Sequence, residues 1–397
     1  MQNHPANQEP RRVLGSFFAP KSQNTPTWEQ RKLGDLCVEF RSGEFISASD
    51  ITETGEYPVF GGNGLRGFTD RFNHDGEYTL IGRQGALCGN VNFAVGKSYF
   101  TEHAIAVRAD KKNQTRFLYY LFSTMDLGQY SGQSAQPGLA VGNLVELKST
   151  LPDKQEQEKI SGVLTALDTL ITLHQRKYEK LVNIKKSMLD KMFPKNGASV
   201  PEIRFKGFTD PWEQRKLSDI VEKVTEKNAG LQYIETFTNS AEFGIISQRD
   251  FFDHDISKIG SLDGYYVVHN EDFVYNPRIS VTAPVGPINR NKLGRTGVMS
   301  PLYTVFRPHD IDTTYLEHFF KSGYWHSFMN FNGDSGARSD RFSIKDSVFF
   351  EMPIPTPDIE EQKKIGEFLT QLDTLITLHQ REHIKPILEV KRVKRNE

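Results

Sequence analysis

The longest regular pattern in the sequence is a stripe of apolar residues in the middle of the chain. No proline occurs between residues 157 and 193, and apolar or amphipathic side chains recur every three or four positions, at Ile160, Leu164, Leu167, Ile171, His174, Tyr178, Leu181, Ile184, Met188 and Met192. This spacing predicts one helix about 55 Å long with a coiled-coil seam. Pro194 and Gly197 are expected to end it.

A second stripe lies near the end of the chain, at Ile365, Leu369, Leu372, Ile376 and His379. Pro386 stands where Leu181 stood in the first stripe, and a proline lacks the backbone donor that a helix interior needs. We therefore predict that this helix kinks or ends near Lys385. His174 and His379 are interpreted as packing or hydrogen-bonding residues, because no carboxylate or cysteine at metal-ligand spacing accompanies them.

The two stripes belong to an internal duplication. Residues 168–176 recur letter for letter as 373–381, and residues 28–33 recur as 212–217. A repeat of this size predicts two globular units, each followed by its own helix. We expect the two helices to pair antiparallel within the chain, because each is the other's natural partner, and pairing with a second chain is the alternative. The segments between the repeated blocks show no alignable match. We therefore interpret these two segments, called the fillings below, as unrelated sequences held between the same repeated blocks.

These segments combine glycine-rich turns with short apolar runs, which predicts short strands. The expected fold class is α+β (mixed α/β): two globular domains separated by two long antiparallel coiled-coil helices, in a pseudo-twofold internal repeat. The predicted parts are an N-terminal arm that could be disordered (1–26), a first domain (27–152), a central helix (153–194), a linker (195–210), a second domain (211–357) and a C-terminal helix with a break near Pro386 (358–397).

Composition narrows the class of protein. The chain has 397 residues, 37% of them hydrophobic, and a net charge of −1. It has no apolar run near 18 residues and no signal-peptide pattern at its start, so we expect a cytoplasmic protein. Two cysteines, Cys37 and Cys88, are too few for a disulfide framework or a cysteine-rich zinc site. Near-neutral charge argues against blanket binding of nucleic acid but allows local basic faces.

The motifs of common catalytic sites do not occur. The sequence has no methyltransferase tetrapeptide, Walker loop, zinc-protease motif or nucleophile elbow. Asp358, Glu361 and Lys363 have the letters of a metal-dependent nuclease, but they stand too close together. Asp358 and Glu361 are better explained as the N-cap and capping box of the second helix. We therefore expect no catalysis, metal or cofactor in this chain by itself.

Some turns carry residues suited to binding. Arg83 and Gln84 lie between glycines, and these side chains can pair bidentately with guanine and adenine edges, although an exposed turn explains them equally well. Polar loops at 131–138 and 332–341 stand at the same point of the two halves. That match raises the chance that both contact a ligand.

The repeated blocks resemble the specificity (S) subunits of type I restriction-modification systems. The resemblance rests on Trp-Glu-Gln-Arg-Lys-Leu opening each half, on the Glu-Gln-x-Lys-Ile and Leu-Asp-x-Leu-Ile helix closing each half, and on Phe-Lys-Gly-Phe-Thr-Asp-Pro-Trp at 205–212. It covers nearly the whole chain. It implies two target-recognition domains that each read half of a bipartite double-stranded DNA target, and helices that set the spacing and dock two methyltransferase subunits.

The resemblance also implies an assembly that methylates adenine from S-adenosylmethionine and, with motor-nuclease subunits, cleaves DNA using ATP and Mg²⁺. Those cofactors would belong to the partner subunits. The candidate DNA-contacting residues are Arg66, Arg83, Gln84, Gln133, Gln136, Asn276, Arg278, Ser280, Arg290, Arg338 and Arg341. The candidate helix-interface residues are Ile160, Leu164, Leu167, Ile171, Tyr178, Leu181, Ile365, Leu369, Leu372 and Ile376. The alternative is a coiled-coil scaffold that joins two protein-binding domains without reading DNA.

Overall fold

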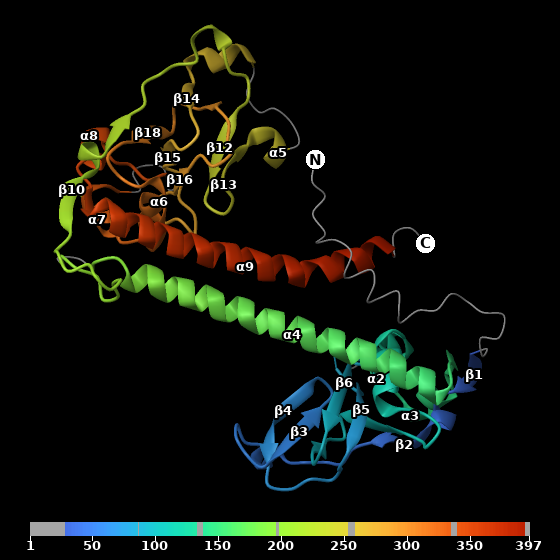
Figure 1. The fold of residues 1–397 in the computed structure, drawn as a ribbon. Helices are drawn as coiled ribbons and strands as arrows, with labels where there is room; N and C mark the ends of the chain where they lie inside the picture. The colour runs from blue at the N-terminus through green and yellow to red at the C-terminus, as the bar shows by residue number, and fades with distance from the viewer. Residues whose placement is uncertain are drawn as a thin grey trace, which may run out of the picture. The chain divides into compact units, whose positions relative to one another are not determined.

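The computed structural model describes residues 28–85, 87–132, 138–195, 198–252, 259–334 and 340–393. The chain divides into two compact units, Met1–Ile171 and Thr172–Glu397, each of which mixes helices and strands (Figure 1). The long helix α4 (Lys154–Lys191) contributes its first part to the first unit and the rest to the second. No helix in the described ranges is long and apolar enough to cross a membrane.

The first unit is built on a four-stranded antiparallel sheet in the order β2-β8-β5-β6. A smaller sheet has the order β4-β3-β7, and β1 pairs with β9, so that the strands entering and leaving the domain lie together. Helix α2 (Thr115–Ser123) packs on β5 and β6, and α3 (Val141–Glu146) precedes β9. The strands are β1 (Glu29–Lys32), β2 (Cys37–Ser42), β3 (Tyr57–Gly61), β4 (Gly64–Thr69), β5 (Glu77–Gly82), β6 (Val91–Val95), β7 (Tyr99–Phe100), β8 (Ala104–Ala109) and β9 (Lys148–Leu151).

The core of this unit follows from alternation along the central strands. In β5, Leu80 and Ile81 point to opposite faces of the sheet and both are buried. Ile81 packs with Phe117, Leu118 and other apolar residues of α2, and Leu80 packs in a second cluster on the other face. The sheet is therefore covered on both sides, which explains why consecutive residues of β5 (78–82) and β8 (104–107) are all buried.

The second unit holds the remaining elements, which include the C-terminal helix α9. Its strands are β10 (Glu213–Lys216), β11 (Val221–Lys223), β12 (Phe237–Ser240), β13 (Gly244–Ser247), β14 (Tyr266–Val268), β15 (Phe273–Tyr275), β16 (Ile288–Arg290), β17 (Gly297–Met299), β18 (Thr304–Pro308) and β19 (Pro353–Thr356). Its helices are α5 (Gln248–Phe252), α6 (Thr313–Ser322), α7 (Trp325–Asn332), α8 (Asp346–Phe349) and α9 (Ile359–Val393).

The second domain repeats the fold of the first. Its four-stranded sheet has the order β11-β18-β15-β16, β10 pairs with β19 as β1 does with β9, and α6 follows β18 as α2 follows β8. Our interpretation of the two fillings as unrelated was therefore wrong. The fold depends on which positions are buried rather than on the exact residue at each position. Two sequences can therefore diverge beyond alignment and keep the same sheet.

Gln157 and Gln362 occupy the same place in the two repeated helices and make the same two hydrogen bonds. Nε2 of Gln157 donates to the carbonyl of Pro152 (3.0 Å), and its Oε1 accepts from the backbone N–H of Gln114 (3.1 Å). Gln362 makes the equivalent bonds to a proline carbonyl (2.8 Å) and to the N–H of Asp312 (2.9 Å). Each buried glutamine thus joins the start of a long helix to the start of α2 or α6.

The second part of α4 pairs antiparallel with α9 inside the second unit. Nδ1 of His174 lies 3.1 Å from Nδ1 of His379, and further along Lys185 forms an ion pair with Asp373. The seam residues Leu181, Ile184, Met188, Ile365, Leu369 and Leu372 join one hydrophobic core, while Tyr178 and Ile376 are half-buried. The predicted pairing within the chain is confirmed, and the two histidines hydrogen-bond to each other.

The predictions for the two ends of α9 fare differently. The helix continues to Val393, so of the two predicted outcomes it does not end near Lys385, and a kink at Pro386 stays a prediction. A proline removes one donor, which a long helix tolerates when the turns on either side keep their bonds. At the other end Asp358 caps the helix, accepting from the N–H of Glu361 (3.1 Å). The Glu361 carboxylate does not complete a capping box, because it binds Arg204 and Trp212 instead.

A buried ion-pair network in α6 gives the second unit a testable pH dependence. Glu317 is buried and lies 2.6 Å from both Arg290 and Lys321 and 3.2 Å from Lys292. Burial alone would raise the pKa of Glu317, but Lys321, Arg290 and Lys292 outweigh burial and lower the pKa to about 2. Because the folded-state pKa lies below the ordinary 4.5, the stabilisation is complete above pH 4.5 and is lost as the pH falls toward 2.

We therefore expect the free energy of unfolding to fall by about 3 kcal/mol across that window because of Glu317. Glu317→Gln should remove this part of the pH dependence, and Glu242→Gln, at an exposed position, should leave it unchanged. Urea unfolding at a series of pH values measures the effect. Identical pH profiles for the two variants would contradict the role of Glu317.

Candidate nucleic-acid interface

In the first domain, three segments far apart in the sequence meet at the end of β5. The backbone carbonyl of Arg83 accepts from the N–H of Leu139 (2.9 Å), and Gln84 forms a bridge with Gly138, where the polar loop ends. A Cβ atom at Gly82 would come within 2.2 Å of the Gly62 carbonyl oxygen, so the β3–β4 hairpin also packs against this turn. The glycines are needed for close backbone approach, and the site is a junction of turns.

The candidate side chains of this domain differ in exposure. Arg66 and Gln84 are exposed, and Arg83 is half-buried, with its guanidinium 3.5 Å from the carbonyl oxygen of Glu102. Gln133 and Gln136 lie outside the described residues. The structure therefore presents Gln84 and Arg66 to solvent around the turn, and Arg83 lies behind them as part of its framework.

The second domain builds the same junction from other residues. The N–H of Phe342 donates to the carbonyl of Pro277 (2.8 Å), and Arg278 forms a bridge with Arg341. The turn after β15 thus pairs with the end of a polar loop, as the turn after β5 does. Asn276 joins it to the β12–β13 hairpin, because its Nδ2 donates to the carbonyl of Asn239 (2.8 Å).

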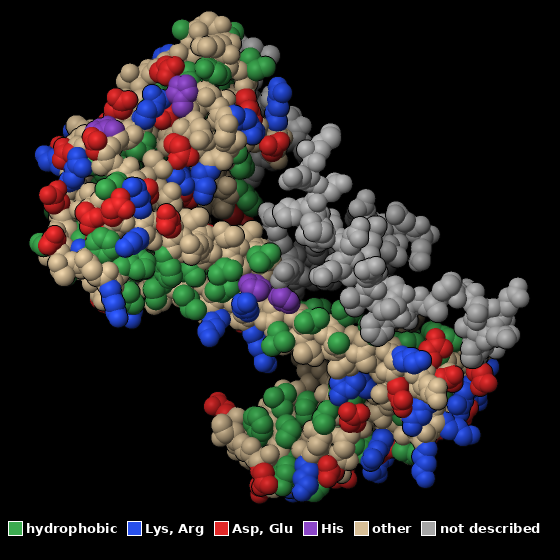
Figure 2. All heavy atoms as spheres, in the orientation of Figure 1, with side chains coloured by type: hydrophobic (Ala, Val, Ile, Leu, Met, Phe, Trp, Pro, Cys, Tyr) green, Lys and Arg blue, Asp and Glu red, His purple; other side chains and the backbone are tan. Residues whose placement is uncertain are grey.

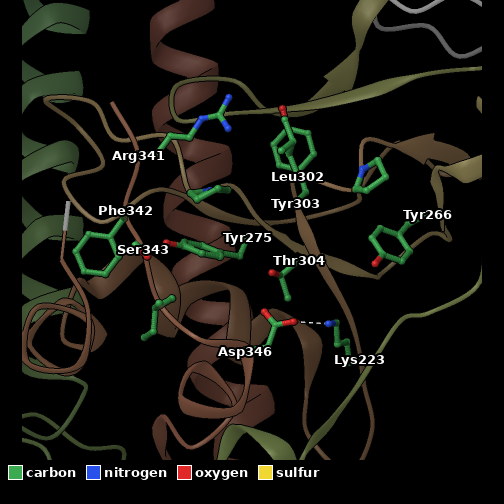
Figure 3. A pocket seen from close by; sticks show the side chains of 13 residues that line it. Lys223, Tyr266, Tyr275, Leu302, Tyr303, Thr304, Arg341, Phe342, Ser343 and Asp346 are labelled. Atoms are coloured by element: carbon green, nitrogen blue, oxygen red, sulfur yellow. Dashed lines mark hydrogen bonds and ion pairs between the residues drawn. The ribbon is translucent and has the colours of Figure 1, made fainter. Parts of the chain in front are cut away.

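Two clefts open at this junction, on either side of a wall formed by Pro277, Leu302, Tyr303 and Arg341. The cleft of about 480 Å³ in Figure 3 is lined further by Lys223, Tyr266, Tyr275, Thr304, Phe342, Ser343, Ile344 and Asp346, with Lys223 paired to Asp346. The cleft of about 410 Å³ includes Asn239, Ser240, Asn276, Arg278 and Ser280. Aromatic rings, hydroxyls and arginines that line an open cleft are suited to contacts with base edges and phosphates.

The candidate residues of this domain differ in whether their polar atoms already take part in hydrogen bonds or ion pairs within the protein. Arg278 is exposed, 3.6 Å from Asp340, and Arg341 lines both clefts. Ser280 holds a turn, because its Oγ accepts from the N–H of Ala283 (3.1 Å). Both polar atoms of the Asn276 side chain are already hydrogen-bonded. Its Nδ2 donates to the Asn239 carbonyl, and its Oδ1 accepts from the N–H of Arg278.

Arg290 is the candidate that the structure does not support. Its guanidinium is buried against Glu271 (2.9 Å) and Glu317 (2.6 Å), so it belongs to the internal network and we remove it from the set. Arg338 lies outside the described residues. Leu302 and Tyr303 were missed, although the Ser-Pro-Leu-Tyr turn before β18 was visible in the sequence.

The helices carry a second surface that the periodic stripe did not reveal. Leu170 and Leu173 of α4 are 51% and 55% exposed, and Leu375 and Leu378 of α9, at the same places in the repeat, are 41% and 48% exposed. Hydrophobic side chains along the helical part of the second unit are visible in Figure 2. Contiguous exposed apolar side chains mark protein–protein interaction surfaces, and here the same pair of leucines is exposed on both helices.

The interface residues predicted from the stripe divide between two roles. Ile160 packs against the core of the first domain, and Leu164 and Ile171 are half-buried. Leu167 is 49% exposed, so it resembles the outward-facing leucines rather than the seam. Counting in steps of three and four selects one stripe. It missed the outward-facing leucines that lie one position before and two positions after Ile171 and Ile376.

A family model assigns the chain to a class. The type I restriction modification DNA specificity domain matches residues 26–183 and again residues 209–388. The chain therefore belongs to this family, and the resemblance inferred from the repeated blocks is confirmed. Each match covers one globular segment and most of the long helix that follows it.

Individual relatives agree with this assignment. The specificity subunit of the type I restriction enzyme EcoprrI from Escherichia coli is 45% identical over 146 residues, which is 36% of each chain. The MjaVIII specificity subunit from Methanocaldococcus jannaschii is 23% identical over 383 residues, 89% of this chain and 88% of that one. The crystal structure of an S subunit from M. genitalium covers 94% of this chain and 96% of its own, with a TM-score of 0.60 at 15% identity, and shares the fold.

Proposed function

We propose that this chain is the non-catalytic DNA-recognition subunit of a type I restriction-modification complex, and that each domain reads one half of a bipartite target. The observation that carries the proposal is the repeated junction of turns. Its backbone pairing is the same in both domains, whereas the candidate side chains at its surface are Arg66 and Gln84 in one and Arg278 and Arg341 in the other. One scaffold with two sets of base-reading side chains is suited to two different half-sites.

The charges are consistent with this role. A net charge of −1 is low for a protein that binds DNA alone, since phosphate contacts supply much of the affinity. Partner subunits would share those contacts, and this chain would contribute mainly contacts to bases. The assembly would act on DNA in the cytoplasm.

The duplicated leucines support docking of two copies of one partner, a methyltransferase subunit on each helix. Identical nine-residue segments in α4 and α9 each expose a leucine pair, so each can bind the same surface of a partner. Motor-nuclease subunits would join through the complex. S-adenosylmethionine, ATP and Mg²⁺ would be held by these partners and not by this chain.

Changes at the two junctions should act on different half-sites. We expect Arg278→Ala with Arg341→Ala to lower methylation about 10- to 100-fold through the half-site read by the second domain, because a bidentate contact contributes about 1–3 kcal/mol. Arg66→Ala with Gln84→Ala, the two exposed candidates of the first domain, should affect the other half-site. Methylation of duplexes altered in one half-site at a time measures this, and Arg295→Ala, outside both clefts, is the control. Equal losses at both half-sites would contradict separate readers.

The alternative of a protein scaffold differs in its salt dependence. DNA binding by the complex should be specific for one sequence and should weaken steeply as salt rises. Electrophoretic titration with matched and scrambled duplexes at several salt concentrations tests this. An intact complex with no preference among duplexes would favour the scaffold.

A further inference from the structure

We propose that Val281 and Leu87 are specificity-determining residues that contact thymine methyl groups, one in each half-site. The inference rests on the proposed function and extends it to residues that the sequence patterns did not single out. Val281 is 102% exposed and Leu87 is 50% exposed. Val281 lies in the connection from β15 to β16 and Leu87 in the connection from β5 to β6, which are the same connection of the repeated sheet.

The backbone around Val281 is fixed although its side chain is in water. The N–H of Ser280 donates to the carbonyl of Ala283 (3.0 Å), and the N–H of Ala283 donates back to the Ser280 carbonyl (3.2 Å) and Oγ (3.1 Å). Valine is stiff at χ1, so little side-chain entropy remains to be lost on contact. A rigid turn that holds a β-branched apolar side chain fully in water contributes little to the fold, but it is preorganised for binding.

Leu87 is held in a comparable way by different residues. The N–H of Cys88 donates to the carbonyl of Gly85 (3.0 Å), and the N–H of Asn90 donates to that of Leu87 (3.0 Å). The N–H of Gly89 donates to the carbonyl of Gly82 at the end of β5 (2.8 Å), which closes the turn. Two domains with unalignable sequences therefore each expose an apolar side chain in the same connection of the sheet, on a turn held by backbone hydrogen bonds.

The surroundings of Val281 indicate what it contacts. The cleft beside it is lined by Arg278, Ser280 and Arg341, and these side chains suit phosphates and the polar edges of bases. A single apolar residue among them is a poor anchor for a protein partner, whose hot spots are packed clusters. In the major groove the apolar feature that distinguishes one base pair from another is the thymine 5-methyl group. The chemistry therefore favours thymine in a duplex.

Replacing thymine by uracil removes only that methyl group and gives a direct test. The assembled complex would methylate duplexes in which each thymine of the target is replaced by uracil, one at a time. For the wild type we expect one position in the half-site of the second domain where uracil lowers the methylation rate about three- to tenfold, the scale of one buried methyl group. Val281→Ala should show that loss with thymine and no further loss with uracil.

Leu87→Ala should give the same result in the other half-site, so that each variant is a control for the other. Ile234→Ala, an exposed apolar position that lines neither cleft, should keep the wild-type response to uracil. Unchanged melting temperatures show that the variants fold. A wild type that is indifferent to every uracil, or a Val281→Ala variant that keeps full sensitivity, would overturn the inference. A wild-type complex that methylates no motif would instead overturn the proposed function.

Discussion

Leu173→Asp together with Leu378→Asp is expected to abolish assembly of this chain with methyltransferase subunits. Both leucines are about half exposed and stand at the same place in the repeated segments of α4 and α9. A carboxylate placed in an apolar interface loses its hydration without gaining a partner, which costs several kcal/mol at each site. Because the side chains face outward, the folded chain should be unaffected.

The two single variants test whether each helix binds its own methyltransferase subunit. If each helix docks one partner, Leu378→Asp alone should leave complexes with one methyltransferase subunit instead of two, and Leu173→Asp alone should do the same. Mass photometry of the purified assemblies counts the subunits. Val200→Asp, at an exposed apolar position outside the repeat, should keep both partners. A double variant that still binds two subunits would remove docking from these leucine faces.

Glu361→Ala is expected to destabilise the second unit by about 3–5 kcal/mol, the cost of removing one partner from a buried ion pair. The Glu361 side chain is fully buried and accepts from Nε and Nη2 of Arg204 (2.7 and 2.8 Å) and from Nε1 of Trp212 (3.1 Å). This carboxylate thus fixes the residues before β10 to the start of α9. Its loss leaves the guanidinium and the indole N–H without their acceptor.

Glu156 provides a matched control, since it stands at the same place in the first repeat. It is only partly buried, and Trp28, the counterpart of Trp212, is 48% exposed. Glu156→Ala should therefore change the free energy of unfolding by less than about 1 kcal/mol, as most exposed substitutions do. Urea unfolding followed by tryptophan fluorescence compares the two variants. Equal losses would mean that the Arg204 contact contributes little to stability.

The sequence was most informative where the pattern is local and long. The seam from Leu181 to Met188, its partner from Ile365 to Leu372 and the cap at Asp358 follow from spacing and residue type. The common fold of the two domains could not be predicted in this way, because strands such as β15 and β16 are three residues long and pair across the sequence. Short strands leave too few positions for a periodic signal.

The candidate site shows the same limit at the level of single residues. Arg83 and Gln84 were found because glycines mark their turn, but only the fold shows that this turn meets the end of the polar loop at Gly138. Arg290 resembles Arg278 in the sequence, yet one is buried in an ion-pair network and the other faces solvent. Charge at a residue is visible in the sequence, whereas its exposure depends on tertiary contacts.

The measurement that tests the central claim most directly is methylome sequencing of a methylation-deficient host. One culture would express this chain together with a type I methyltransferase subunit, and the other the methyltransferase subunit alone. We predict a bipartite N6-methyladenine motif that appears only when this chain is present, with one half altered by Arg278→Ala and Arg341→Ala. No motif from a pair of proteins that still co-purify would contradict the claim that this chain reads DNA.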